Sequence, residues 1–339
     1  MKKIKIMKKY SIAIACMLSF VLNGMAQQDA QFSQYMFNKT LLNPAATGSD
    51  DINVSVLYRT QWVSQPGAPK SFGLVADMPV ANKRVGVGLI LISTTQGPLK
   101  FTRINTNYSY KINVGEGGGL YLGLQAGLVQ YGIDRSILKT RDDVSLDQTF
   151  SGDNLRRIIP DFGFGLMYKS EKFYIGLTVP HLLQSKIKFI NQMVDTAGTS
   201  KERNIFTQVF RHYYATAGVN IDVNEDFQVQ PSFITRYVVN APFAADINCN
   251  VTYKKMVWAG LGYRISNIGG VIGMVGLNLS NTFKVGYAFD FTTSGLSVNT
   301  GLSHEIMLSY HLDSKGGSGG SSKKSSKKNS GVKKPYFLK

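Results

Sequence analysis

Cysteine is almost absent from this chain. The 339 residues include only two cysteines, Cys16 and Cys249. Cys16 lies in an N-terminal leader, so an exported form of the chain keeps one cysteine and cannot form an intramolecular disulfide. Exported proteins often depend on disulfides for stability. This chain must therefore be stabilised in another way, for example by extensive strand pairing.

Residues that could carry chemistry are also few. There are four histidines, and none has the helical spacing of a metal-ligand pair or a cysteine nearby. His304 and Glu305 are adjacent, but a hydrogen bond at a strand end explains them as well as a ligand pair does. No nucleophile elbow is present, and the glycine-rich residues 115–119 lack the features of a phosphate-binding loop. We therefore expect no enzyme, no cofactor and no metal centre.

Long apolar runs are missing once the leader ends. Residues 1–26 combine five lysines, an apolar region over 11–22 and small residues at 24–26, as a secretory signal peptide does, so the mature chain should begin near Gln27. The apolar region is too short for a membrane anchor. Lipoprotein processing at Cys16 is an alternative that would cut this region in half. If the mature chain lies in a membrane, it crosses as strands.

The positive charge of the chain is concentrated at its two ends. The formal net charge is +17. The leader contributes five lysines, and the tail over 313–339 contributes eight lysines against one aspartate, which leaves a net charge of about +5 for the residues between them. The high isoelectric point is therefore weak evidence for a body that binds nucleic acid, and we expect no nucleic-acid partner.

Short strand candidates separated by turn signals fill residues 50–312. Valine, isoleucine, tyrosine, phenylalanine and threonine are frequent there, glycine recurs inside the runs, and helical periodicity is rare. About fourteen runs are predicted: 52–60, 71–77, 84–92, 100–112, 120–131, 161–168, 172–179, 213–221, 227–237, 246–254, 257–264, 271–280, 283–290 and 305–312.

Alternation within these runs favours a membrane barrel over a soluble sandwich. In residues 120–128 leucine and alanine fall on one face, whereas tyrosine, glycine and glutamine dominate the other. In residues 257–264 one face is apolar and the other carries Trp258, two glycines and Arg264. A barrel wall needs one face for lipid and one for the lumen.

The lengths of the connections give the stronger argument. Long connections, such as 133–160 and 181–212, fall between an odd strand and the next even one, and two- or three-residue turns fall at the other end. Outer-membrane barrels have short periplasmic turns and long outer loops. We therefore predict an all-β transmembrane antiparallel barrel of about 14 strands with both termini in the periplasm.

The segment between the leader and the first strand, residues 27–49, is rich in aromatic residues. A mobile tail would not need three aromatic residues and two leucines, so we expect this segment to pack as a plug in the lumen or its periplasmic mouth. The residues expected to pack there are Phe32, Tyr35, Phe37, Leu42, Asn43 and Pro44.

Two other regions are candidates for contact with partners. The outer loops suggest a binding surface that includes Gln61, Trp62, Arg156, Arg157 and His181. Five aspartates in residues 133–160 permit calcium, although interspersed arginines also fit a solvated loop with internal salt bridges. The tail over 313–339 has the composition of a disordered segment and is either a solvated spacer or a contact with an anionic periplasmic component. That contact would use Lys323, Lys324, Lys327, Lys328, Lys333 and Lys334.

Several motifs together resemble the PorP/SprF family of the type IX secretion system. Each is weak alone, and their number and order make the resemblance specific over nearly the whole mature chain. The lysine-rich extension after Leu312 departs from family members that end near the last strand. The motifs are Gln31–Asn38, Leu42–Ala45, Tyr58–Trp62, Gly67–Pro69, Pro160–Gly165, Phe173–His181, Arg211–Tyr213, Pro231–Phe233, Trp258–Arg264, Gly286–Asp290 and Ser303–Ile306.

The resemblance implies an outer-membrane barrel, in contact with membrane lipids, that serves type IX secretion. It implies one of two roles. One is a partner and anchor for a secreted adhesin with a type B C-terminal domain, including adhesins of gliding motility. The other is a general component that links the outer membrane to the other type IX secretion components. A transporter for a hydrophobic small molecule and a porin remain alternatives, because a fold does not specify a function.

Overall fold

The computed structural model describes residues 29–115, 117–134, 155–194, 200–239, 241–266, 269–280, 282–293 and 301–312. The expected signal peptide, the lysine-rich tail and residues 135–154, with the question of calcium, lie outside this part of the chain. Within it, the only helices are short 3-10 turns, η1 (Tyr35–Phe37), η2 (Lys39–Leu41) and η3 (Pro44–Ala46). No helix among the described residues is long and apolar enough to cross a membrane.

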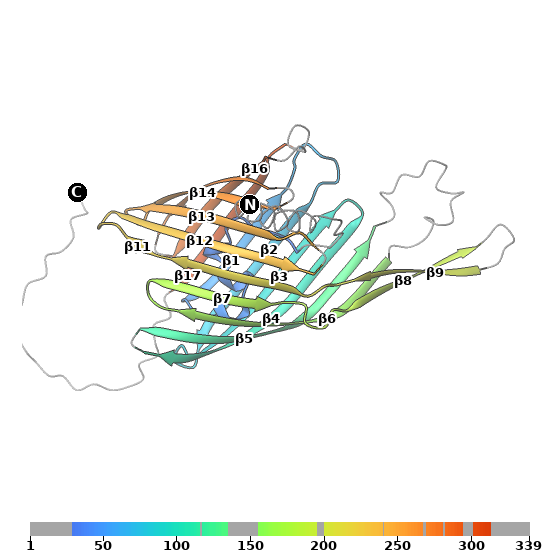
Figure 1. Cartoon of the computed structure of the whole chain (residues 1–339), viewed down its shortest axis with the longest axis horizontal. Coiled ribbons are helices and arrows are strands. Elements are labelled where there is room, and N and C mark those ends of the chain that lie inside the picture. The colour runs from blue at the N-terminus through green and yellow to red at the C-terminus, as the bar shows by residue number, and fades with distance from the viewer. Residues whose placement is uncertain are drawn as a thin grey trace, which may run out of the picture.

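Almost all of the remaining chain forms one antiparallel sheet whose neighbouring strands follow one another in sequence (Figure 1). The β-branched and aromatic residues of the predicted runs supply its strands. These strands are β1 (Ile52–Thr60), β2 (Lys70–Val80), β3 (Val85–Gln96), β4 (Leu99–Val114), β5 (Gly118–Ile133), β6 (Leu155–Lys169), β7 (Phe173–Val179), β10 (His212–Val219), β11 (Ile221–Asp222), β12 (Phe227–Val238), β13 (Ala244–Tyr253), β14 (Val257–Ile265), β15 (Gly270–Asn278), β16 (Phe283–Thr292) and β17 (Ser303–Leu312).

The sheet closes on itself and forms a barrel. The first and last strands pair over their whole length, from Ile52 opposite Leu312 to Thr60 opposite His304. β10 pairs with both β7 and β12, and β11 continues along β12. The barrel therefore has fourteen strands, as the sequence predicts, and the predicted boundaries differ from the observed ones by a few residues at most strand ends. Closure gives every wall strand two neighbours, although residues 155–163 of β6 extend beyond the end of β7.

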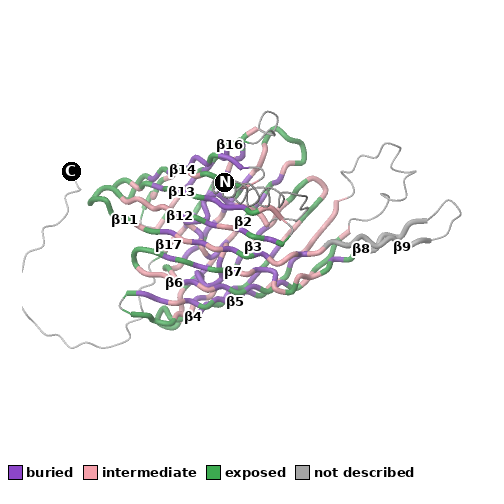
Figure 2. Tube along the Cα trace, viewed as in Figure 1, coloured by how far each residue is buried: buried purple, intermediate pink, exposed green. Residues whose placement is uncertain are grey.

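Burial alternates along the strands (Figure 2). Leu122, Leu124 and Leu128 of β5 are exposed on the outer face, whereas Tyr121 and Gln125 are buried on the inner face. On β14, Trp258 and Arg264 are buried and their apolar neighbours are exposed. The face predicted to contact lipid is thus the exposed outer face. Cys249 lies on it as a free cysteine.

Connections of different length gather at opposite ends of the barrel. The short turns, such as 81–84, 170–172 and 254–256, lie at one end, named here the short-turn end. The other end, named the long-connection end, carries 61–69, 180–211 and 239–243. The link 97–98 between β3 and β4 is short although it lies at the long-connection end. The connection 266–269 between β14 and β15 lies at this end too and is no longer than the turn 81–84.

One long connection contains structure that the sequence did not predict. Residues 181–212 were expected to be a loop, yet β8 (Lys186–Val194) and β9 (Ser200–Gln208) form a separate antiparallel hairpin. The hairpin projects from the barrel beyond the ends of β5 and β6 (Figure 1). At its base Ile187 and Val209 are buried against a set of partly buried apolar residues, Tyr131, Ile133, Leu155 and Ile159. The base is therefore fixed to the wall.

Candidate functional site

Residues 29–51 run through the inside of the barrel from one end to the other. At the long-connection end, Asp29 contacts Arg103, His181 and Tyr214. At the short-turn end, Asp50 forms ion pairs with Lys39 and Lys169. We name residues 29–51 the inner segment. The N-terminus was expected in the periplasm, but Asp29 lies at the opposite end from the short turns; residues 1–28 are outside the described chain, so the position of the N-terminus stays a prediction.

Apolar side chains of the inner segment fill the middle of the barrel. Phe32, Tyr35 and Met36 are each at most 2% exposed. They belong to one core cluster with inward residues from β1–β3, β12 and β14–β17, which include Leu57 of β1, Val75 of β2, Ile234 of β12, Ile272 of β15 and Met307 of β17, whereas Ala45 and Ala46 pack against β5, β6 and β7 in a second cluster. Because the cluster joins strands on many sides of the barrel, the lumen at this level is packed with side chains.

The six residues expected to pack in the lumen do not have equal burial. Phe32, Tyr35, Asn43 and Pro44 are buried. Phe37 and Leu42 are half-buried and pack against the core cluster. The Phe37 ring lies 4.5 Å from the ring of Trp258, and Lys284 lies over its face.

The turn at Asn43 lies directly on the backbone of the wall. The Asn43 side chain accepts a hydrogen bond from the Ala45 amide at 2.9 Å and caps η3. It also donates to the Leu166 carbonyl of β6 at 3.1 Å. A Cβ atom at Gly165 would lie 2.0 Å from the Asn43 Oδ1, and one at Gly123 would lie 2.1 Å from the Ala45 nitrogen. Glycine in these strands is therefore what allows the segment to approach.

A buried charged cluster holds the next part of the segment, towards the long-connection end. The amide groups of Ser33 and Gln34 donate to the carboxylate of Glu305 at 2.7 and 2.9 Å. Arg59 forms ion pairs with Glu305 and Asp290. Around the wall the chain of ion pairs continues through Arg264, Asp246 and Arg236. Three arginines meet three carboxylates here, so the cluster has no net charge.

Asp29 is held by a second buried cluster. Arg103 of β4 donates to its carboxylate at 3.0 Å, the His181 Nε2 lies at 3.2 Å and the Tyr214 hydroxyl donates at 3.3 Å. The other ring nitrogen of His181 contacts Asp161 at 2.8 Å. His181 and Arg103 are 3% and 6% exposed. His181 was expected on an outer binding surface, but the structure places its ring inside, between two carboxylates.

The two carboxylates favour the charged form of His181. Burial alone would lower the pKa of His181, but Asp29 and Asp161 raise it to about 9. Burial alone would raise the pKa of Asp29, but the charges of His181 and Arg103 hold it well below its usual range. Both groups are therefore ionised at neutral pH.

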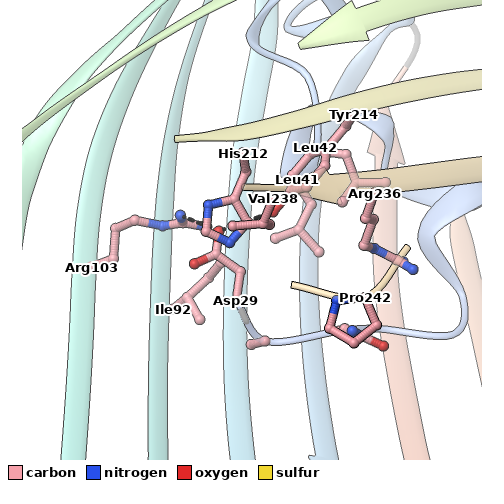
Figure 3. Close-up of a pocket in the computed structure, with 12 residues that line it drawn as sticks. Asp29, Leu41, Leu42, Ile92, Arg103, His212, Tyr214, Arg236, Val238 and Pro242 are labelled. Carbon is pink, nitrogen blue, oxygen red and sulfur yellow. Dashed lines mark hydrogen bonds and ion pairs between the residues drawn. The ribbon is translucent and has the colours of Figure 1, made fainter. Parts of the chain in front are cut away.

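A small cavity of about 30 Å³ lies beside Asp29 (Figure 3). In Figure 3 Asp29 points towards Arg103, and His212 lies next to them. Leu41 and Leu42 of the inner segment and Pro242 of a long connection also line it. At the short-turn end a larger cavity of about 470 Å³ is lined mainly by polar and charged groups, which include Asp50, Asp226, Lys284 and His311.

The remaining expected contact residues lie near the long-connection end. Arg156 and Arg157 of β6 are exposed, and Arg157 donates to the Lys188 carbonyl at 3.0 Å, which ties the hairpin to the wall. Gln61 and Trp62 follow β1 and are partly exposed. They lie in a different connection from the hairpin. The tail lysines are outside the described residues.

His304 and Glu305 point to opposite faces of β17. Glu305 is buried in the lumen, whereas His304 contacts the Tyr287 hydroxyl at 2.6 Å on the outer side. The two side chains therefore cannot act as one ligand pair. Among the described residues no group of three histidine, cysteine or carboxylate side chains is placed to hold a metal ion.

Sequence reasoning missed most of the residues that hold the inner segment. These residues are Asp29, Arg59, Arg103, Asp161, Asp246, Arg264, Asp290 and Glu305. Each of those on a strand occupies an inward position close to the long-connection end. A charged residue on the lumen face of a predicted strand was the signal that could have found them.

Comparison with known protein families assigns the chain. Residues 24–310 match the model of the type IX secretion system membrane protein PorP/SprF. The chain belongs to the PorP/SprF family. It is therefore an outer-membrane barrel of the type IX secretion system, since the members of this family are membrane proteins of that system. No curated protein matches the chain.

Solved structures with a similar fold are distant in sequence. The CymD monoaromatic hydrocarbon channel is 13% identical, with a TM-score of 0.50 over 83% of this PorP/SprF chain and 93% of that one. The toluene transporter TbuX of Ralstonia pickettii is 10% identical, with a TM-score of 0.48 over 81% and 92% of the two chains. At this identity the likeness to CymD shows the barrel fold alone.

Proposed function

We propose that this barrel is the outer-membrane partner and anchor of a secreted adhesin with a type B C-terminal domain. It binds that domain at the long-connection end and holds the adhesin at the cell surface, including for gliding motility. The short-turn end then faces the periplasm, where other type IX components act. Family membership supports the secretion role, and the choice of an adhesin as partner is our inference.

The β8–β9 hairpin is the observation that carries this proposal. Its base is fixed to the wall by Ile187 and by the bond from Arg157 to Lys188. In the described part of the chain β8 pairs only with β9, so neither strand has a second strand partner along its outer edge, although the Lys188 carbonyl accepts the bond from Arg157. Such edges recruit a strand from another chain. A projecting hairpin with a fixed base is suited to dock a folded domain by strand addition.

The filled lumen supports binding in preference to conduction. Phe32, Tyr35 and Met36 pack against strands on many sides of the barrel. A porin or a transporter for hydrophobic molecules would need a path along this axis. We expect the purified barrel to give no steady open channel in a planar lipid bilayer, and stable conductance would contradict the idea that the inner segment closes the lumen.

Shortening the hairpin tests the proposal. Replacing residues 188–206 by Asn-Gly removes the projecting part of the hairpin, with the bond from Arg157 to Lys188, and keeps Ile187 and Val209 at the base. We expect normal amounts of barrel in the outer membrane and loss of one adhesin from the cell surface, while other type IX cargo is still secreted. A matched control replaces the short turn 254–256 at the opposite end, where no effect on display is expected.

A general role in the secretion machinery is the second candidate. The observation that favours it is the position of Leu312, since β17 ends at the short-turn end beside the polar cavity that His311 lines. The lysine-rich tail therefore leaves the barrel on the side where we place the periplasm. Truncation after Leu312 should stop all type IX cargo if the tail contacts an anionic component of the machinery. Loss of one adhesin alone would support the first proposal.

A further inference from the structure

The groups around Asp29 have the form of a site built for a carboxylate. Three donors converge on its oxygens, a guanidinium from Arg103, a ring nitrogen from His181 and a hydroxyl from Tyr214. They come from β4, from the connection after β7 and from β10, and all three belong to the barrel wall. Charge-assisted hydrogen bonds of this kind are the strong ones that recognise carboxylates.

The backbone at His181 is held in a conformation that few residues adopt. Its φ angle is 56°, in the left-handed region. The surrounding contacts keep it there, since one ring nitrogen binds Asp161 and the other faces Asp29. Strained backbone of this kind concentrates at functional sites, where it fixes a side chain for its task. The contact with Asp161 of β6 fixes one side of the ring from the wall and leaves the other ring nitrogen facing Asp29.

Charge balance makes an anion necessary at this position. Arg103 and protonated His181 are matched by Asp29 and Asp161. Departure of Asp29 would leave two buried cations with one carboxylate. An uncompensated buried charge is strongly unfavourable. The site must then bind another anion or His181 must lose its proton.

Asp29 is the one member of this cluster that does not belong to the wall. Its side chain is 17% exposed, compared with 7% for Arg103 and 2% for His181. It is the first described residue, and it lies beside the small cavity at the long-connection end (Figure 3). His212 lines this cavity, and its buried Nε2 has no hydrogen-bond partner among the described residues. Because the His212 Nδ1 donates to the Phe210 carbonyl, this Nε2 can donate to an incoming carboxylate only if the ring takes up a second proton.

We propose that Arg103, His181 and Tyr214 form a carboxylate-binding site that Asp29 occupies in the resting barrel and that a carboxylate of the docked exported polypeptide occupies in its place. The polypeptide as the source of this ligand rests on the proposed function, whereas the site itself does not. Exchange frees the start of the inner segment while Asn43–Ala46 remains seated against β5 and β6. The carboxylate is either the C-terminus of the polypeptide or an acidic side chain.

Chemical rescue tests the site without the secretion partner. In purified D29A, sodium acetate should raise the Tm of the barrel by about 3 °C when the acetate concentration is about ten times its Kd for the site. Acetamide, which has a similar shape and no charge, and sodium chloride at the same ionic strength should not. The matched control is D50A, which removes a carboxylate at the other end of the segment. The Asp50 side chain is 54% exposed, so acetate should have no specific effect there.

Two peptides distinguish the sources of the carboxylate. Acetyl-Ala-Ala-Ala with a free C-terminus and acetyl-Ala-Asp-Ala-amide are added to D29A in place of acetate. A shift with the first alone assigns the site to a chain end, and a shift with the second assigns it to an acidic side chain. If D29A does not fold alone, it is refolded in the presence of each additive, and the yield of folded barrel is compared in place of the Tm.

Equal responses to acetate, acetamide and chloride would overturn the proposal, as would an equal response of D50A to acetate. If acetate rescues D29A but the adhesin is still displayed after the hairpin is removed, the carboxylate site stands and the adhesin is not its ligand. If the adhesin is lost from the surface after the hairpin is removed but acetate does not rescue D29A, the proposed function stands and the carboxylate site is rejected.

Discussion

The inner segment is held in two different ways at its two ends. Residues 29–34 are held by charge, since Asp29 faces Arg103 and His181, and the Ser33 and Gln34 amides bind Glu305. Residues 43–47 are held by shape, since they lie where glycine leaves the wall bare. Charged contacts can be exchanged for another ligand of the same charge. A close fit of backbone on backbone cannot be exchanged for a ligand in this way. The segment therefore has one exchangeable end and one fixed end.

Removing a cation from the charge-held end should have the largest effect on stability. R59M leaves Asp290 and Glu305 buried without their shared partner. Breaking a buried pair costs about 3–5 kcal/mol. We expect the variant to lose about that much free energy of unfolding, measured by denaturant titration in detergent.

The matched control is K83M, which breaks the exposed ion pair with Asp51. Exposed pairs contribute about 0–1 kcal/mol, so little change is expected. Equal losses in R59M and K83M would mean that the buried cluster does not fasten the segment.

Filling the glycine surface at the shape-held end should have the next largest effect. G165V places atoms where Asn43 lies, because even a Cβ would be 2.0 Å from its Oδ1. Overpacking costs about 1–3 kcal/mol. The loss should appear as a lower temperature for the change in electrophoretic mobility of the folded barrel.

G132V is the control for strand propensity, because the nearest atom to a Cβ there is 3.6 Å away. A loss in G132V as large as that in G165V would contradict the role of close approach.

The cap at Asn43 should contribute a smaller amount. N43A removes the bond from the Ala45 amide and the bond to the Leu166 carbonyl. Loss of a cap costs about 0.5–2 kcal/mol. We expect a shift within that range by thermal unfolding and no change in the acetate response of a D29A background. A changed acetate response would show that the two ends are coupled.

High pH should loosen the charge-held end. The pKa of His181 is raised from 6.5 to about 9, so its contribution is complete below pH 6.5 and is lost as pH rises through about 9. The titratable and charged groups around the His181 ring are Asp29, Asp161, Arg103, His212 and Tyr214.

The measurement is thiol labelling of A30C in a C249A background. The labelling rate of any cysteine rises between pH 7 and pH 10, because more of the thiol is ionised. The rate for A30C should rise by more than the rate for free cysteine does. The rate for A46C, near the fixed end, should rise only as much as that for free cysteine. An equal excess at both positions would contradict the distinction between the ends.

The wall could be predicted from the sequence, and most of its internal contacts could not. Alternation and turn signals identified all fourteen wall strands, because lipid outside and a lumen inside impose a period of two. The β8–β9 hairpin was missed because it lies beyond the wall, where nothing requires an apolar outer face. The ion-pair partners of Arg59 and Asp29 lie more than seventy residues away in the chain, and local patterns do not specify such pairs.

Glycine gave a signal whose meaning appeared only with the structure. Its recurrence inside strands was visible in the sequence, and Gly123 and Gly165 prove to be the places where the inner segment meets the wall. A glycine on the lumen face of a predicted strand predicts a close neighbour, but it does not say which segment that neighbour is.

Pairing of the first strand with the last determines when the barrel can be completed. β17 carries Glu305, which binds Ser33 and Gln34, and Met307, which packs in the core cluster. The first described residues are therefore fastened by the last strand of the sheet. The strand that closes the seam with β1 is therefore the same strand that fastens the inner segment, so the wall cannot have its full set of contacts unless its contents are in place.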